Sequence, residues 1–99
     1  MNERPIPEAA NRDENSVEML RAWIAERGLH CSMKVGMYSE MGKSEERAWG
    51  ILLADVTRHI ANALFEEHGI EKTKTLTSIR ESYLTELSKP TSEVKGKFV

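Results

Sequence analysis

One loop in this chain has the composition of a phosphate-binding loop. Residues 36–44 read GMYSEMGKS, between an alternating strand pattern and a long helical pattern. A P-loop places four residues between its first glycine and the Gly-Lys-Ser/Thr, so that successive backbone N–H groups converge on the phosphates. Here five residues intervene, and Glu40 would repel a phosphate. We therefore interpret the segment as a glycine-flanked turn in which Ser44 caps the next helix.

A second possibility is acid–base chemistry by Asp55 and His59. They are four residues apart on a predicted helix, which is close enough for a carboxylate to orient an imidazole as a general base requires. No nucleophile accompanies them in the local sequence, and Arg58 lies beside them. The pattern therefore favours a surface or dimer-contact ion pair, and we assign no catalytic residue.

The sequence does not predict a metal site. His30 and Cys31 are consecutive on a predicted strand, so their side chains point to opposite faces. A metal would need several converging Cys, His or acidic ligands. The methionines near Cys31 are typical core filler. We expect neither a metal nor a cofactor.

Composition describes one small globular domain. The chain has 99 residues, of which 39% are hydrophobic and 30% charged, and its formal net charge is −2. This balance gives no attraction for duplex DNA or an anionic membrane. A single cysteine cannot form an intramolecular disulfide, no apolar stretch approaches the ~20 residues of a membrane span, and the N-terminus lacks a secretory signal pattern. We expect a cytoplasmic protein.

The elements that would position these residues are three helices and one strand. Apolar residues at helical spacing predict helices over about 16–27, 45–67 and 71–88. Between the first two, residues 29–37 alternate apolar and polar side chains, which predicts a half-buried strand. The expected fold is α+β in the order α-β-α-α. It comprises a single domain over 15–90, an irregular proline-containing arm over 1–14 and a loosely held tail over 91–99.

One strand cannot satisfy its own backbone hydrogen-bonding groups, so it needs a neighbour. The arm, a hairpin through residues 37–42, or the same strand of a second copy could supply it. Pro5 and Pro7 weaken the first option, and the second has few strand-forming residues. Pairing with the same strand of a second copy is self-complementary about a two-fold axis, so we expect a homodimer.

A strand followed by two helices also matches ribbon-helix-helix repressors, in which Ser32 and Lys34 would read the major groove. The slightly acidic composition and the length of the second helix argue against this alternative.

The strings PIPEAA, LRAW and AWGILLADVTRHIANAL resemble a small family of bacterial proteins that is catalogued only as a domain of unknown function. The resemblance runs from about Pro5 to Thr91, and its most specific parts are Ala48-Trp49-Gly50 and the trio of Asp55, Arg58 and His59. It implies a bacterial, cytoplasmic, stand-alone domain, and it implies no activity.

The sequence therefore favours a self-associating binding or regulatory module without catalytic activity. A small enzyme or ligand-binding protein that uses Asp55 and His59 is the second alternative, after a DNA-binding regulator. We expect any ligand or partner to contact the residues that combine polar groups with an aromatic side chain, namely His30, Lys34, Trp49, Asp55 and His59.

Overall fold

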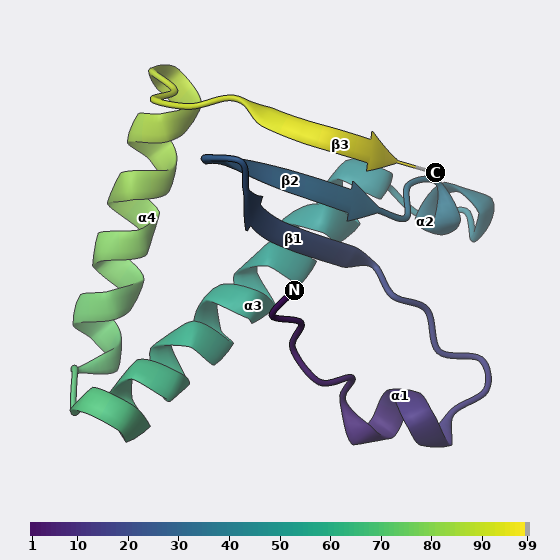
Figure 1. Cartoon of the computed structure of the whole chain (residues 1–99), viewed down its shortest axis with the longest axis horizontal. Helices are drawn as coiled ribbons and strands as arrows, with labels where there is room; N and C mark the ends of the chain where they lie inside the picture. The colour runs from purple at the N-terminus through teal and green to yellow at the C-terminus, as the bar shows by residue number, and fades with distance from the viewer. Residues whose placement is uncertain (99) are drawn as a thin grey trace.

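The computed structural model describes residues 1–98, with side chains through residue 96. Its elements follow one another as α1 (Glu8–Arg12), β1 (Leu20–Ala25), β2 (Gly28–Met33), α2 (Met37–Glu40), α3 (Glu45–His68), α4 (Lys72–Ser88) and β3 (Val94–Phe98). The α+β class is confirmed, whereas the expected count of three helices and one strand is wrong. The two long helices lie on one side of a three-stranded sheet (Figure 1).

The first helix expected over residues 16–27 is wrong, because Leu20–Ala25 forms β1. β1 and β2 are an antiparallel hairpin in which Ala25 pairs with Gly28, so Glu26 and Arg27 alone make the turn. Both turn residues have positive φ, 49° and 65°, as a type I′ turn requires. Asn and Gly are the usual residues in such a turn. Because neither occurs at positions 26 and 27, the sequence did not predict the hairpin.

The expected strand over 29–37 is shorter, since β2 ends at Met33 and residues 37–40 form α2. β2 is also not unpaired. It is the middle strand of the sheet, with β1 on one side and β3 parallel to it on the other. β3 comes from the segment assigned above to a loosely held tail. The inference that β2 must pair with a second copy is therefore overturned.

The helices begin and end where their capping residues predict. The Ser44 side chain accepts a hydrogen bond from the Arg47 N–H (3.2 Å), and Gly69 ends α3 with φ 67°. α3 and α4 then pack as a hairpin whose centre is Ala61 and Thr75, respectively 2% and 5% exposed.

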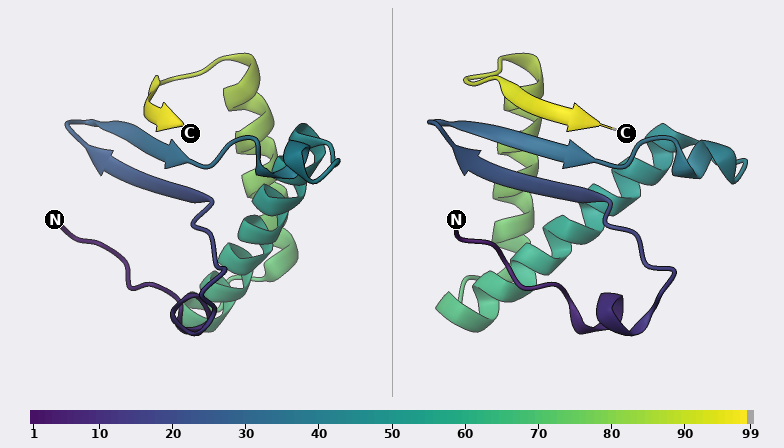
Figure 2. Two further views of the ribbon diagram at one scale, coloured as in Figure 1. Left: turned by 90° about the vertical axis from the view of Figure 1, so that its right-hand side faces the viewer. Right: turned by 45° about the vertical axis from the view of Figure 1, so that its right-hand side comes forward.

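The sheet and the helices stay apart. Among the residues described, the sheet packs on none of the helices, α3 contacts α2 and α4, and Ala61 is the one buried apolar residue. The left view of Figure 2 shows the sheet on one side of the molecule and the long helices on the other. The radius of gyration is 15.4 Å, compared with about 12.6 Å for a compact domain of this length. The chain is therefore folded locally without closing a shared core.

Candidate functional site

The predicted contact residues lie on separate parts of the fold. Asp55 and His59 are exposed on α3, and Trp49 is half-buried one and a half turns before Asp55. His30 lies on β2, opposite Trp23 of β1, and Lys34 follows the strand. Because the described part of the sheet does not contact α3, His30 and Lys34 are not brought to the other three residues.

Asp55 and His59 do line one shallow pocket of about 400 Å³ between α3 and α4. Its other polar side chains are Arg58, Asn62 and Lys72. Asp55 accepts a hydrogen bond from Arg58 on the same exposed helix surface, which is the ion pair that the sequence favoured. Exposed pairs of this kind contribute little to stability. The pocket could hold a small polar ligand, but it is open and its charges are already paired in part.

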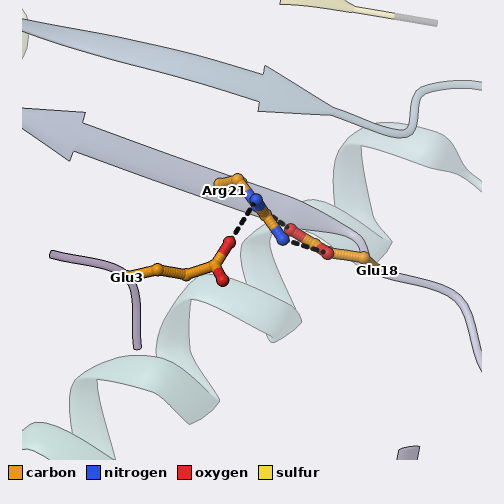
Figure 3. A network of polar contacts seen from close by, with 3 residues as sticks. All are labelled: Glu3, Glu18 and Arg21. Carbon is orange, nitrogen blue, oxygen red and sulfur yellow. Dashed lines mark hydrogen bonds and ion pairs between the residues drawn. The ribbon is translucent and has the colours of Figure 1, made fainter. Parts of the chain in front are cut away.

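A larger pocket of about 660 Å³ lies between the N-terminal arm and β1. Arg21 of β1 holds the arm there. Its Nη1 is 2.8 Å from a Glu3 carboxylate oxygen, and its Nε and Nη2 donate to the Glu18 carboxylate at 2.6 and 3.1 Å (Figure 3). The hydrogen bond from Arg21 lowers the pKa of Glu18, and the same contact raises the pKa of Arg21. Two carboxylates thus occupy the Arg21 guanidinium, whereas Arg4, which also lines the pocket, donates to the Asn2 side-chain oxygen.

Glu45, the first residue of α3, accepts more hydrogen bonds than any other carboxylate described. It accepts hydrogen bonds from the N–H of Gly36 (2.8 Å), from the N–H of Ser39 (3.0 Å) and from Trp49 Nε1 (3.1 Å). The Gly36 bond is the main cause of its lowered pKa. Glu45 therefore ties the start of α2 to α3, a structural role that explains why Trp49 is held in place. The only feature of the sequence that could have indicated this role is the position of Glu45 at the start of a helix, directly after a glycine-containing loop.

Within residues 1–98, no three His, Cys, Asp or Glu side chains converge as metal ligands. None of the helices in that range is both long and apolar enough to cross a membrane. The ribbon-helix-helix alternative also loses its geometric basis, because β2 is flanked on both sides by strands of its own chain.

Comparison with known proteins gives a family and a fold neighbour. The family described as "Domain of unknown function (DUF5076)" matches residues 3–91, which confirms the resemblance drawn from the sequence. A solved structure from the photosynthetic bacterium Rhodopseudomonas palustrus CGA009, described as a "putative pyruvate dehydrogenase", is 28% identical. The alignment covers 98% of this chain and 94% of that one, with a TM-score of 0.68. No curated protein matches the chain.

Proposed function

The chain belongs to the family "Domain of unknown function (DUF5076)", and we propose that it acts as a self-associating binding module whose first partner is a second copy of itself. The observation that carries this proposal is the exposed area. The chain exposes 8752 Å², whereas a compact protein of 11.3 kDa exposes about 5,700 Å². An excess of exposed area is expected of a subunit that is separated from its neighbour.

The character of the exposed surface supports the same function. Large apolar side chains are exposed on the sheet and on both long helices, including Ile24, Ile60 and Leu87. Monomeric soluble proteins rarely leave such surfaces uncovered. Strongly perturbed pKa values, by contrast, are typical of catalytic sites. Here the shifts found in residues 1–96 belong to Glu18, Arg21 and Glu45, which hold the arm and α2 in place.

Sedimentation velocity tests the proposal directly. We expect the chain at micromolar concentration to sediment with at least twice its 11.3 kDa mass. A mass of one chain, with cooperative unfolding and no dependence of stability on concentration, would refute self-association.

A ligand-binding or enzymatic role for the pocket of Asp55 and His59 is the second candidate, and the pocket itself is the observation in its favour. Because the Rhodopseudomonas structure is described as a "putative pyruvate dehydrogenase", pyruvate is one compound to test. A thermal-shift screen with pyruvate, nucleotides and divalent metals separates the two functions, because a ligand that prefers the folded state raises its stability. A shift that disappears in Asp55→Asn and His59→Gln would favour this second candidate.

A further inference from the structure

The three-stranded sheet has one apolar face. Residues that pair across β1, β2 and β3 point to the same side, and one side carries Leu20, Ala22, Ile24, Leu29, Cys31, Met33, Val94 and Gly96. We refer to these eight residues as the sheet face. The reverse side is mostly polar and carries Arg21, Trp23, His30, Ser32 and Lys95. A sheet with this pattern is built to be covered on one side.

The sheet face is turned towards the side of the molecule that holds the helices. β2 and β3 are parallel, and their connection through α3 and α4 is right-handed (Figure 1). The Lys34 N–H donates to the carbonyl oxygen of Met19, on the β1 side (3.0 Å), so the peptide groups of Met33 turn towards β3. In a right-handed connection between parallel strands, an L-residue whose N–H and C=O point towards the next strand carries its side chain on the side of the connecting helices. The side chain of Met33, and with it the sheet face, is therefore on the side of α3 and α4.

The helices of the same chain nevertheless leave half of this face exposed, since Leu20, Leu29, Cys31 and Met33 are half-buried whereas Ala22, Ile24, Val94 and Gly96 are exposed. Ile24 is 80% exposed and Val94 is 63% exposed. On α3, the apolar residues Leu53, Val56 and Ile60, which we refer to as the α3 stripe, are 37%, 44% and 42% exposed. In a closed two-layer domain, a sheet face and a helix stripe cover each other. Here both surfaces are formed and each is covered only in part.

The size of the exposed area and the net charge of the chain indicate which kind of partner covers the sheet face. The chain exposes about 3,000 Å² more than a compact protein of its mass. Permanent homodimer interfaces bury about 2,000–5,000 Å² in total, or about 1,000–2,500 Å² from each chain, so the excess of one chain is more than such an interface needs. A net charge of −2 gives no attraction for a nucleic acid. A second copy brings one sheet face and one α3 stripe, and a two-fold axis satisfies both at once.

We propose that the sheet face of each copy packs against the α3 stripe of the other. This packing rests on the self-association proposed above. Each of the two resulting hydrophobic cores then contains side chains from both chains. Pairing of β1 edges contributes less, because Arg21 holds the N-terminal arm beside that edge through Glu3. The dimer expected from an unpaired strand is thereby replaced by a dimer of packed faces.

The single cysteine makes this packing testable, since Cys31 lies on the sheet face. The wild-type chain is coexpressed with a differently tagged Cys31→Ser/Ile60→Cys chain, and a short bismaleimide is added. We expect a covalent product that carries both tags, because the only two cysteines in a mixed dimer are on the surfaces proposed to meet. The matched control is Cys31→Ser/Asn62→Cys, since position 62 is exposed and faces the opposite side of α3. We expect at least tenfold less product from the control.

Each outcome of this experiment decides a different point. Equal crosslinking at positions 60 and 62, or none at either while the sedimenting mass is that of two chains, would overturn the proposed packing and leave self-association standing. A sedimenting mass of one chain would overturn both proposals. A mass of two chains with selective crosslinking at position 60 would support both.

Discussion

Replacing Ile60 by alanine should weaken the dimer by an amount that follows from the exposure of this side chain. The substitution removes three carbon atoms, and full burial of each is worth about 0.8 kcal/mol. Since 42% of Ile60 is available to a partner, the loss is about 1 kcal/mol for each copy and about 2 kcal/mol for the dimer. A loss of this size raises the dimer dissociation constant about 30-fold.

The effect is measured by sedimentation equilibrium over a dilution series, with Asn62→Ala as the control. Alanine has the highest helix propensity, so neither variant should weaken α3 itself. We expect the control to stay within about threefold of the wild-type dissociation constant, since Asn62 is exposed and polar. If Ile60→Ala dimerised as tightly as the control, Ile60 would not lie in the interface and the reasoning from its exposure would be wrong.

Four further predictions concern local structure and use urea unfolding unless stated. Glu26→Asn with Arg27→Gly should stabilise the protein by about 1–2 kcal/mol, because both residues have positive φ in the two-residue turn; an unchanged midpoint would contradict a type I′ turn. Thr75→Val should stabilise by about 1 kcal/mol, because the Thr75 hydroxyl is buried without a hydrogen-bond partner, and a destabilised variant would indicate a partner such as water. Gly96→Ala should accelerate hydrogen exchange throughout β2, because its Cβ would lie 1.9 Å from a carbonyl oxygen of that strand and its φ is 126°; unchanged exchange would argue against β2–β3 pairing. The folded-state pKa of Glu45 is lowered, so its contribution to stability is present above its unfolded pKa of about 4.5 and is lost as pH falls through the folded value. Glu45→Gln should therefore have a lower urea midpoint than the wild type at neutral pH, and the two midpoints should approach each other in acid. If the difference between the two midpoints did not change with pH, the charge of the Glu45 carboxylate would not be the cause of the lower stability.

The parts of the fold that the sequence predicted well are those with strong local signals. α3 and α4 carry long apolar stripes, and Ser44 and Gly69 mark the two ends of α3 as capping residues do. The start of β2 was also found, because its apolar and polar residues alternate. Local propensity and tertiary structure agree in these segments, so the local pattern was sufficient.

β1 was missed because its residues fit two periods. Leu20 and Ile24 are four apart, as on a helix, but Leu20, Ala22 and Ile24 also alternate as on a strand. Glu26 and Arg27 gave no turn signal, so the helix was expected to continue through residue 27. β3 was missed because it depends on a distant partner: nothing within residues 94–98 indicates that β2 lies beside them. That Asp55 and His59 lie one turn apart on α3 followed from helical spacing, whereas the several bonds of Glu45 depend on how the loop folds back.

The parallel pairing of β2 with β3 also has a consequence for biosynthesis. Leu29 pairs with Val94, so the hairpin of β1 and β2 can form early on the ribosome while one edge of β2 stays bare until residues 94–98 have been made. A bare edge beside an uncovered apolar face is the kind of surface on which nascent chains aggregate. The chain is therefore most prone to aggregate during synthesis, before β3 has paired with β2.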